Sequence, residues 1–222
     1  MTQPAEKPAK KSAASEWWDT LVVIVEALLI AIVLRFFLYQ PFSIPTASMQ
    51  QTLMIGDYFV ANKFVWGYGK HSFSLGRYGD FAMLDFELPI ANRIFGREPN
   101  RGDIAVFRPV PQDIEYIKRI VGLPGDTIRV TDGRLYINGT MVEREQVGTA
   151  LDTDSNGDTR EVIVYRETFP EGTSHLIQEI ADNLPLDNTP EYIVPAGHYF
   201  MMGDNRDRSA DSRALSQVGY VP

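Results

Sequence analysis

The longest apolar stretch of the chain, Thr20 to Leu38, contains only two charged residues, Glu26 and Arg35. As a helix, residues 17–39 would extend about 34 Å, which is enough to cross a hydrocarbon layer of ~30 Å. Insertion of the central Glu26 costs ~3 kcal/mol, whereas the Leu, Ile, Val and Phe residues of the stretch together return about 6 kcal/mol. The pattern therefore predicts a single transmembrane helix at residues 17–39.

Aromatic and basic residues near the two ends of this helix predict its orientation. Three aromatic residues flank it and three lysines precede it, namely Trp17, Trp18, Tyr39, Lys7, Lys10 and Lys11. After Arg35 no Lys or Arg appears until Lys63. Basic residues mark the cytoplasmic end of a membrane helix. We therefore expect residues 1–16 in the cytoplasm and the body on the other side of the membrane.

A cleavable signal peptide is the alternative, because it has the same basic start and apolar middle. Its apolar region would be unusually long here, and residues 39–45 offer no convincing small-x-small cleavage site. A retained membrane anchor is the favoured interpretation.

Beyond Pro41 the chain changes to short strand-like runs separated by Gly, Pro and Asp turns. Asp132-Gly133 and Asn138-Gly139 are typical of tight turns. Two hairpins are expected, residues 127–130 with 134–137, and residues 161–166 with 174–180. The fold class predicted is mainly β, in which an N-terminal transmembrane helix precedes an antiparallel β-sheet domain with a smaller β subdomain inserted into it.

The same signals predict the domain boundaries. The parts expected are a tail at 1–16, a transmembrane helix at 17–39, a catalytic β domain at 40–139 and 191–222, and an inserted subdomain at 140–190.

Lys118 is the residue of the β region that most needs an explanation. Residues 114–121 alternate like a strand and place it on one face with three apolar residues, Ile114, Tyr116 and Ile120. Burial disfavours a charged ammonium, so such a lysine loses its proton more readily. A base that works at about pH 8 needs its pKa lowered by ~2 to 3 units. Alternatively, Lys118 reaches solvent or pairs with a carboxylate such as Asp103.

Composition narrows the classes of function. The 222 residues are 44% hydrophobic, enough for a substantial core. The net charge is −8, and all of it lies in residues 40–222, because residues 1–18 carry +1 and residues 19–39 carry −1. An acidic body without a basic stripe argues against nucleic acid as a partner. Without cysteine, thiolate nucleophiles and cysteine-ligated zinc are excluded.

Several short motifs follow one another along the chain: Ile44-Pro45-Thr46-Ala47-Ser48-Met49, Gly56-Asp57, Arg101-Gly102-Asp103-Ile104, Tyr116-Ile117-Lys118-Arg119 with Gly122-Leu123-Pro124-Gly125-Asp126, and Gly203 to Arg213. Singly each is weak, because a serine after proline usually belongs to a turn and a charged loop is usually a solvated connection. In this order they closely resemble bacterial type I signal peptidase, a serine-lysine endopeptidase that removes signal peptides from exported preproteins. The resemblance covers the chain from the apolar segment to its end.

The resemblance implies a role for each motif. Ser48 would be the nucleophile and Lys118 its general base, and the residue-based argument points to the same lysine. The backbone N–H of Ser48 and the hydroxyl of Thr46 would form the oxyanion hole. Ser209 would orient the lysine amine, and two further residues would brace the loop as an ion pair, Asp211 and Arg213.

The resemblance also implies the substrate. Apolar residues beside the nucleophile and base would form shallow pockets for small residues, namely Phe42, Ile44 and Ile117. Such pockets select Ala-x-Ala-like sites. The expected partners are the signal peptides of secreted preproteins and the lipid bilayer, with no cofactor and no metal.

Two features depart from the family pattern. Threonine stands at position 46, where the family most often has serine; it keeps a donor hydroxyl in a more restricted rotamer. Relatives usually continue past Pro222, and whether the sequence is a fragment stays open.

Three other hypotheses remain open. A Ser-His-Asp hydrolase would use His198, although no Gly-x-Ser-x-Gly motif occurs. A calcium loop is suggested by Asp152-x-Asp154-x-Asn156-Gly157, although its twelfth position is Ile163 where glutamate is expected. A non-enzymatic, membrane-tethered binding module is the third, but it gives no reason to hold Lys118 on an apolar face.

Overall fold

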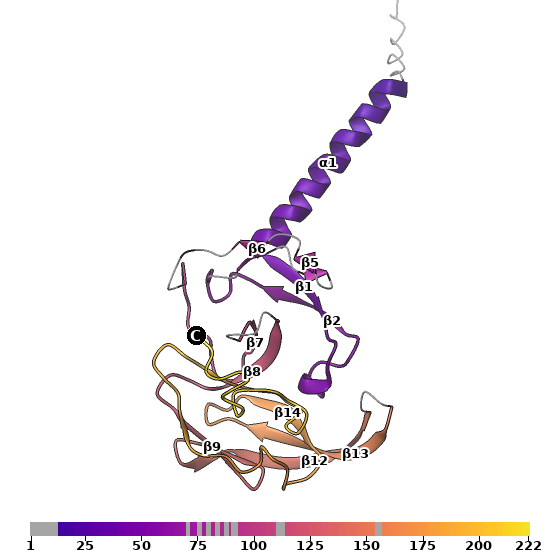
Figure 1. Cartoon of the computed structure of the whole chain (residues 1–222). Helices are drawn as coiled ribbons and strands as arrows, with labels where there is room; N and C mark the ends of the chain where they lie inside the picture. The colour runs from indigo at the N-terminus through magenta and orange to yellow at the C-terminus, as the bar shows by residue number, and fades with distance from the viewer. Residues whose placement is uncertain are drawn as a thin grey trace, which may run out of the picture. The chain divides into compact units, whose positions relative to one another are not determined.

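The computed structural model describes residues 13–69, 72–74, 77–78, 81–82, 85–86, 89, 93–109, 114–153 and 157–222. Within these, the chain divides into two compact units (Figure 1). The first falls within Met1–Pro41 and Val60–Arg97, and the second within Phe42–Phe59 and Glu98–Pro222. The domain boundaries expected from the sequence stay a prediction.

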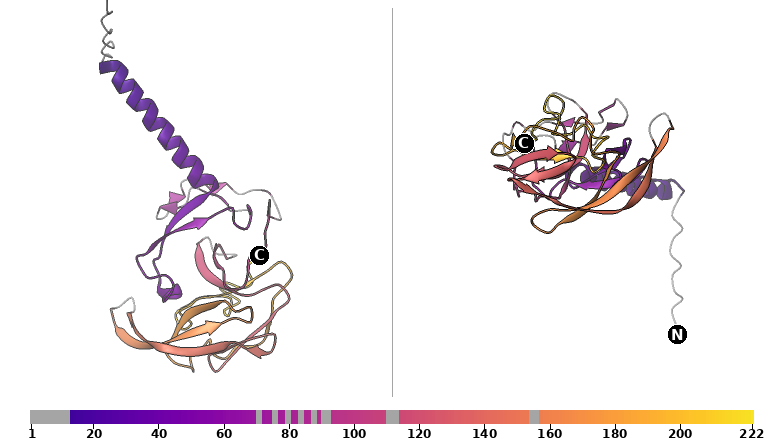
Figure 2. Two further views of the ribbon diagram at one scale, coloured as in Figure 1. Left: turned by 180° about the vertical axis from the view of Figure 1, so that it is seen from behind. Right: turned by 90° about the horizontal axis from the view of Figure 1, so that it is seen from below.

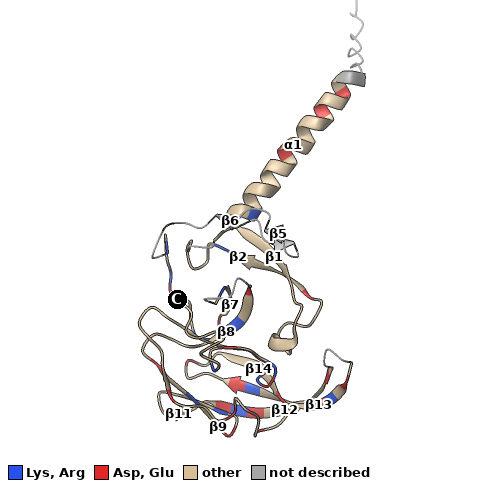
Figure 3. Ribbon diagram, in the orientation of Figure 1, with Lys and Arg blue, Asp and Glu red and all other residues tan. Residues whose placement is uncertain are grey.

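The long helix α1 spans Ala13–Phe37 and belongs to the first unit. Its segment Ser15–Phe37 is long and apolar enough to cross a membrane, and its apolar side chains are exposed. Figure 3 shows how few charged residues this helix carries compared with the strands. The helix was predicted at 17–39; it begins earlier and ends at Phe37, just before the chain enters the strand that begins at Tyr39.

An aromatic cluster holds the C-terminal end of α1 within the first unit. The ring of Phe73 lies 5.4 Å from that of Phe36, 5.5 Å from that of Phe37 and 5.1 Å from that of Tyr68. The Tyr68 hydroxyl also donates to the Phe37 carbonyl at 3.0 Å. This carbonyl is one of the last four of the helix, which have no partner inside it.

Short strand pairs make up the other β structure described in the first unit. The pairs are β1 (Tyr39–Ser43) with β2 (Tyr58–Asn62), β3 (Phe73–Ser74) with β6 (Asp85–Phe86), and β4 (Arg77–Tyr78) with β5 (Phe81–Ala82). The strands of one pair, β1 and β2, are each divided between the two units.

The second unit is built from three antiparallel sheets. Their orders are β16-β8-β7, β11-β10-β9-β15 and β12-β13-β14. The bounds are β7 Ile104–Phe107, β8 Tyr116–Gly122, β9 Thr127–Thr131, β10 Arg134–Ile137, β11 Thr140–Met141, β12 Glu143–Thr153, β13 Thr159–Thr168, β14 Ser174–Glu179, β15 Tyr192–Ile193 and β16 Phe200–Met202. The mainly β fold after one apolar helix is therefore confirmed.

Both predicted hairpins are present. β9 and β10 meet at Asp132-Gly133, whose φ angles of 48° and 69° are those of a primed turn. β13 and β14 pair from Thr168 opposite Ser174 to Ile163 opposite Glu179. The sequence did not predict β12, which pairs with β13 along its length, as both views of Figure 2 show. Most residues of β12 are exposed, so the strand has no alternating apolar pattern.

The core of the second unit lies between its sheets. Buried residues from β8, β9, β10, β15 and β16 form one cluster, which includes Val121, Ile128, Val130, Leu135, Ile137, Tyr192, Phe200 and Met202. Gly122 ends β8 where a Cβ would lie 2.8 Å from Phe200 and 2.9 Å from Ile128. Only glycine allows this close approach, which keeps the end of β8 packed on the core.

Candidate active site

Ser48 lies in a short 3₁₀ turn, Ala47–Met49, that follows β1. Two backbone hydrogen bonds hold the entrance to this turn, from the Ile44 N–H to the Asp57 carbonyl and from the Gly56 N–H to the Ile44 carbonyl, both at 2.9 Å. The side chains of Ile44 and Met49 are buried on either side of Ser48. Ser48 itself is 7% exposed.

Lys118 lies in β8, the central strand of its sheet, opposite Ala105 of β7. Its Nζ is 2.6 Å from the Ser48 Oγ and 2.9 Å from the carbonyl oxygen of Ile117. The residue is 3% exposed. Two residues that are 70 positions apart in the sequence therefore meet in a buried hydroxyl–amine pair.

Burial lowers the pKa of the Lys118 amine to about 8, and the nearby carboxylates Asp211 and Asp204 oppose this shift. Within the described part of the chain Lys118 forms no ion pair, and Asp103 instead accepts from the Asn100 N–H at 2.9 Å. The alternative that Lys118 pairs with Asp103 is therefore wrong. The placement of Ile114 beside it is wrong too, because Ile114 precedes β8 and is 54% exposed.

The loop from Gly203 to Arg213 packs directly against Ser48. The Asn205 N–H donates to the Ser48 carbonyl at 3.1 Å. A Cβ at Gly203 would lie 2.4 Å from that same carbonyl oxygen and 2.2 Å from the Ser209 Oγ. Any other residue at position 203 would therefore separate Ser209 from the nucleophile.

Asp211 and Arg213 form a buried ion pair at 2.9 Å. Burial alone would raise the pKa of the Asp211 carboxyl, but the Arg213 guanidinium holds it below its usual range. Asp211 also accepts from the Gly203 N–H at 3.1 Å, and Arg213 donates to the Arg206 carbonyl at 2.6 Å. The pair therefore cross-links the two ends of the loop.

Ser209 is buried close to Gly203 but does not reach Lys118. The hydrogen bonds of the Lys118 amine go to Ser48 and Ile117, whereas the Ser209 hydroxyl is directed to the Asp211 carboxyl and helps to lower its pKa. The predicted contact between this hydroxyl and the amine is thus not formed in this structure.

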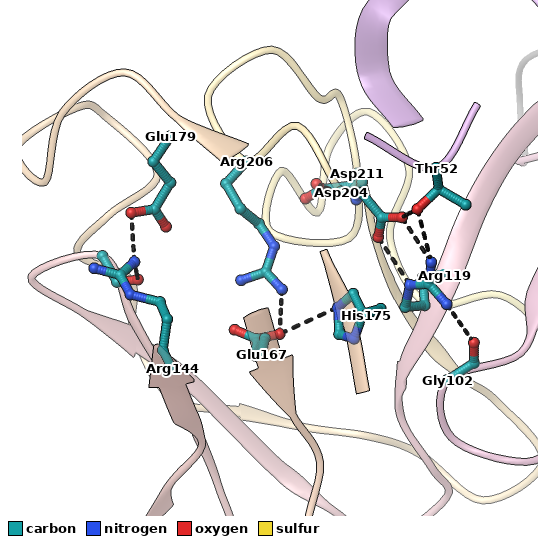
Figure 4. Close-up of polar contacts among 12 residues, drawn as sticks. Thr52, Gly102, Arg119, Arg144, Glu167, His175, Glu179, Asp204, Arg206 and Asp211 are labelled. Atoms are coloured by element: carbon teal, nitrogen blue, oxygen red, sulfur yellow. Dashed lines mark hydrogen bonds and ion pairs between the residues drawn. The ribbon is translucent and has the colours of Figure 1, made fainter. Parts of the chain in front are cut away.

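Two buried charge networks that the sequence did not predict fix the loop from outside (Figure 4). In the first, Arg119 makes two contacts with Asp204, at 2.8 and 2.7 Å, and donates to the Gly102 carbonyl at 2.7 Å. Thr52 also donates to Asp204. The residue next to the lysine is therefore bonded to the residue next to Gly203. Arg119 and Asp204 both lie in the motifs quoted above, so the sequence marked each residue as notable. The sequence did not indicate that the two residues contact each other.

In the second network, Glu167 of β13 accepts from the Arg206 guanidinium, and its carboxylate lies 3.4 Å from His175 of β14. Glu167 is 1% exposed and Arg206 2%. The Arg206 N–H also donates to the Gln178 carbonyl, and the Gln178 N–H to the Asp204 carbonyl. Nothing in the sequence marks Glu167 as a partner of a residue 39 positions away.

A groove of about 450 Å³ opens at the Ser48–Lys118 pair. Six of the residues singled out from the sequence line it: Phe42, Ile44, Thr46, Ser48, Ile117 and Lys118. The Thr46 Oγ lies 3.4 Å from the Ser48 Oγ. The other three, Ser209, Asp211 and Arg213, do not line the groove and lie in the adjoining loop.

The alternative sites lie elsewhere. His198 precedes β16 with its Nδ1 3.0 Å from the Ala196 carbonyl, and it does not line the groove. Of the suspected calcium loop, Asp154 and Asn156 lie outside the described residues, and the Asp152 carboxylate is paired with Arg208 at 3.1 Å.

Comparison with known proteins gives consistent matches. The family model described as signal peptidase, peptidase S26, matches residues 17–222. The signal peptidase I of Rickettsia akari is 39% identical over 100% of this chain and 79% of its own length. That of Rickettsia prowazekii is 41% identical over 87% of this chain and 70% of its own length.

A solved structure of a signal peptidase I from Enterococcus faecalis is 27% identical over 57% of this chain and 97% of its own, with a TM-score of 0.29, too low to inform the fold. The family model and the two rickettsial relatives agree with the resemblance found in the motifs. The chain belongs to the signal peptidase family, peptidase S26, and is a serine peptidase.

Proposed function

We propose that this chain is a membrane-anchored endopeptidase that removes N-terminal signal peptides from exported preproteins, with Ser48 as nucleophile and Lys118 as general base. The observation that carries the proposal is the 2.6 Å separation of the Ser48 Oγ from a buried lysine amine. A hydroxyl alone is a weak nucleophile, and it becomes effective when an adjacent base removes its proton. With its pKa at about 8, a useful fraction of Lys118 is neutral near physiological pH.

The reaction would proceed in two halves. As the Ser48 Oγ attacks the scissile carbonyl, its proton passes to the Lys118 Nζ, and the resulting ammonium then protonates the leaving amine of the mature protein. Water, activated by the same lysine, would cleave the acyl-enzyme and release the signal peptide. Because Lys118 has no ion-pair partner among the described residues, it remains free to exchange its proton in both halves.

The negative charge that develops on the carbonyl oxygen needs donors. The Ser48 backbone N–H and the Thr46 hydroxyl are the groups proposed for this role. Thr46 is exposed at the groove and 3.4 Å from the nucleophile, so its hydroxyl can turn towards a substrate oxygen. Ser209 would orient the lysine amine while the amine keeps its bond to Ser48, and Asp211 and Arg213 would hold the loop that carries Ser209.

Apolar groove walls favour small residues at the first and third positions before the cut. Ile44 is 3% exposed, and Phe42 stacks on Phe59 with ring centroids 5.3 Å apart, so neither wall readily makes room for a large side chain. Ile117 contributes a further apolar surface beside the base. The proposed substrate is therefore an extended Ala-x-Ala-like segment.

The placement proposed for the enzyme is a single pass through the inner membrane, with residues 1–16 in the cytoplasm and the active site on the periplasmic side. An anchored site would meet preproteins while their own apolar segment still holds them in the bilayer.

The test is cleavage of a purified preprotein by the detergent-solubilised protein. Wild type should release the mature protein after a small-x-small site, identified by N-terminal sequencing, and the Ser48→Ala variant should release none. Cleavage elsewhere in the preprotein, or equal cleavage by the Ser48→Ala variant, would refute the proposal.

A further inference from the structure

Phe95 is the most exposed of the large apolar side chains that the structure describes, at 88%. Its φ angle is 54°, in the left-handed region that a bulky residue rarely adopts. Glycine, asparagine or aspartate is the usual residue in such a turn. Neither packing inside the chain nor the geometry of the turn therefore explains a phenylalanine at this position.

The turn that carries Phe95 is held firmly at its base. Tyr68 and Ile94 exchange two backbone hydrogen bonds, at 3.0 and 2.9 Å. A Cβ at Gly67 would lie 2.5 Å from the Ile94 carbonyl oxygen and 2.8 Å from the Gly96 Cα. Only glycine fits between these backbone atoms, so the two segments that meet here are locked together.

The same base is bonded to the C-terminal end of α1. The Tyr68 hydroxyl donates to the Phe37 carbonyl at 3.0 Å, and the Lys63 N–H donates to the Leu38 carbonyl at 2.9 Å. All of these residues belong to the first unit. The exposed ring of Phe95 is thus linked, through Tyr68, to the point where the apolar helix ends.

Other apolar side chains beside these contacts in the sequence are also open to solvent. Five of them are 42% or 44% exposed, namely Phe37, Tyr39, Phe64, Val65 and Ile94. Segments 60–69 and 93–97 contain no Asp or Glu, so no carboxylate would have to leave water if this surface met lipid. Aromatic residues are enriched where a membrane meets water, at the level of the headgroups.

We propose that the turn at Phe95 inserts into the interfacial layer of the bilayer beside the end of α1 and gives the first unit a second attachment to the membrane. This inference rests on the proposed anchoring by α1. The partner is the lipid surface, because a helix that crosses the bilayer brings that surface to its own C-terminal end, where the turn is bonded. A helix alone would let this unit tilt about the point of exit, whereas a second contact fixes its depth.

The test uses the absence of cysteine from the chain. Arg97→Cys places a single fluorescent dye at an exposed position two residues after Phe95. The full chain is reconstituted in phosphatidylcholine vesicles, and the dye is quenched either by iodide in water or by lipids that carry a nitroxide near the headgroup. The measured quantity is the ratio of lipid quenching to iodide quenching.

Two further single-cysteine proteins calibrate this ratio. Leu28→Cys, in the middle of α1, reports on the hydrocarbon layer, and Thr2→Cys, in the N-terminal tail, reports on water. The ratio at position 97 should lie between these two values and exceed that of the tail by about two-fold or more, because an apolar ring removed from water holds the turn in the interface.

Variants at position 95 separate the ring from the turn. Phe95→Asn removes the apolar ring, and asparagine adopts the left-handed conformation more readily than phenylalanine, so the turn should persist. The ratio at position 97 should then fall to that of the tail. Phe95→Trp keeps an interfacial ring and should retain the ratio. Leu151→Asn, at an exposed apolar position of β12, is the matched control and should leave the ratio unchanged.

The outcomes separate this inference from the anchoring on which it rests. A ratio at position 97 equal to that of the tail, or an unchanged ratio in Phe95→Asn, overturns the inference and assigns the exposed turn to a partner other than lipid. If iodide quenches the dye at Leu28 as strongly as the dye in the tail, the membrane anchor itself is refuted, and the inference falls with it.

Discussion

At the scale of single residues, Lys118 combines burial with a hydrogen bond to a hydroxyl and with the absence of an ion pair among the described residues. A lysine that only filled space would place its amine at the surface or against a carboxylate. The Asp211 and Asp204 carboxylates that could neutralise it are held by Arg213 and Arg119. Such an arrangement is what the proposed role of Lys118 as a general base requires.

The pH dependence of kcat/KM follows from this environment. The neutral amine is the active form and the pKa of Lys118 is about 8, so activity should rise with pH on the alkaline side of neutrality and level off above about 9. The measurement is kcat/KM for a preprotein peptide between pH 5 and 10. A rising limb near ~6.5 would indicate an imidazole base instead.

Thr46 offers a test of the oxyanion hole. Thr46→Val keeps the shape of the side chain and removes its donor, so kcat should fall by ~10² to 10³. Thr46→Ser restores the hydroxyl and should stay within a few-fold of wild type. Steady-state turnover of a signal-peptide substrate measures both. Wild-type turnover in the valine variant would leave stabilisation of the oxyanion to backbone groups alone.

The sequence identified the residues of the candidate site better than their contacts. Ser48 and Lys118 stand in recognisable motifs, and an amine on an apolar strand is unusual enough to attract attention. The ion pairs Arg119–Asp204 and Glu167–Arg206 were not predicted. Charged residues are common in the sequence, and the partners of these two pairs are 85 and 39 positions apart, so that only the folded chain brings them together. The predicted bond from Ser209 to Lys118 is not formed, since the amine bonds Ser48 and Ile117 instead.

At the scale of elements, turn chemistry made the hairpins predictable and the lack of an apolar pattern hid β12. Asp132-Gly133 specifies a primed turn, and the alternating strands on either side need no tertiary context. β12 is held by its pairing with β13 and exposes most of its side chains. Such a strand is determined by its neighbour more than by its own residues.

The sheet β12-β13-β14 braces the 203–213 loop, and Glu167 tests how strongly. Glu167→Gln leaves the buried Arg206 charge without its partner, so the free energy of unfolding at pH 7 should fall by ~3 to 5 kcal/mol. Glu161→Gln, at an exposed position of the same strand, should change it by less than ~0.5 kcal/mol. Denaturant unfolding of the two variants checks this, and equal stability would mean that the pair is dispensable.

Acid should remove the same contribution. Burial opposes ionisation of Glu167, but Arg206 together with His175 lowers its pKa from 4.5 to about 2. A carboxyl whose pKa is lower in the folded state than in the unfolded state stabilises the fold at pH values above its unfolded-state pKa. This stabilisation is lost as the pH falls from the unfolded-state pKa to the folded-state pKa. The difference in stability between wild type and Glu167→Gln should therefore shrink as pH falls from about 4.5 towards 2. A difference that stays constant over this range would contradict the assignment.

At the scale of the whole molecule, the apolar helix could be predicted from the sequence alone, because a stretch of about 20 predominantly apolar residues is typical of a membrane span. The division of the chain into two compact units was harder to predict from the sequence. The structure divides the chain within β1, directly after Pro41, within β2, after Phe59, and again after Arg97. Boundaries of this kind depend on which segments pack together.

Membrane topology is the corresponding test. Lys7, Lys10 and Lys11 precede the helix, and no Lys or Arg follows Arg35 until Lys63, so the body should face the periplasm. Protease added to intact spheroplasts should digest the body, and a tag on the N-terminal tail should stay protected. Protection of the body and loss of the tag would reverse the orientation.

The account depends most on lysine-assisted attack by Ser48, and preprotein processing by a Lys118→Met variant tests it most directly. Methionine preserves the length and the apolar packing of the side chain while deleting the amine, so the variant should fold with a wild-type circular dichroism spectrum. Cleavage of the preprotein should then be undetectable, whereas His198→Ala, away from the groove, should process it at nearly the wild-type rate. A folded Lys118→Met protein that still removes the signal peptide at close to the wild-type rate would contradict the serine-lysine mechanism.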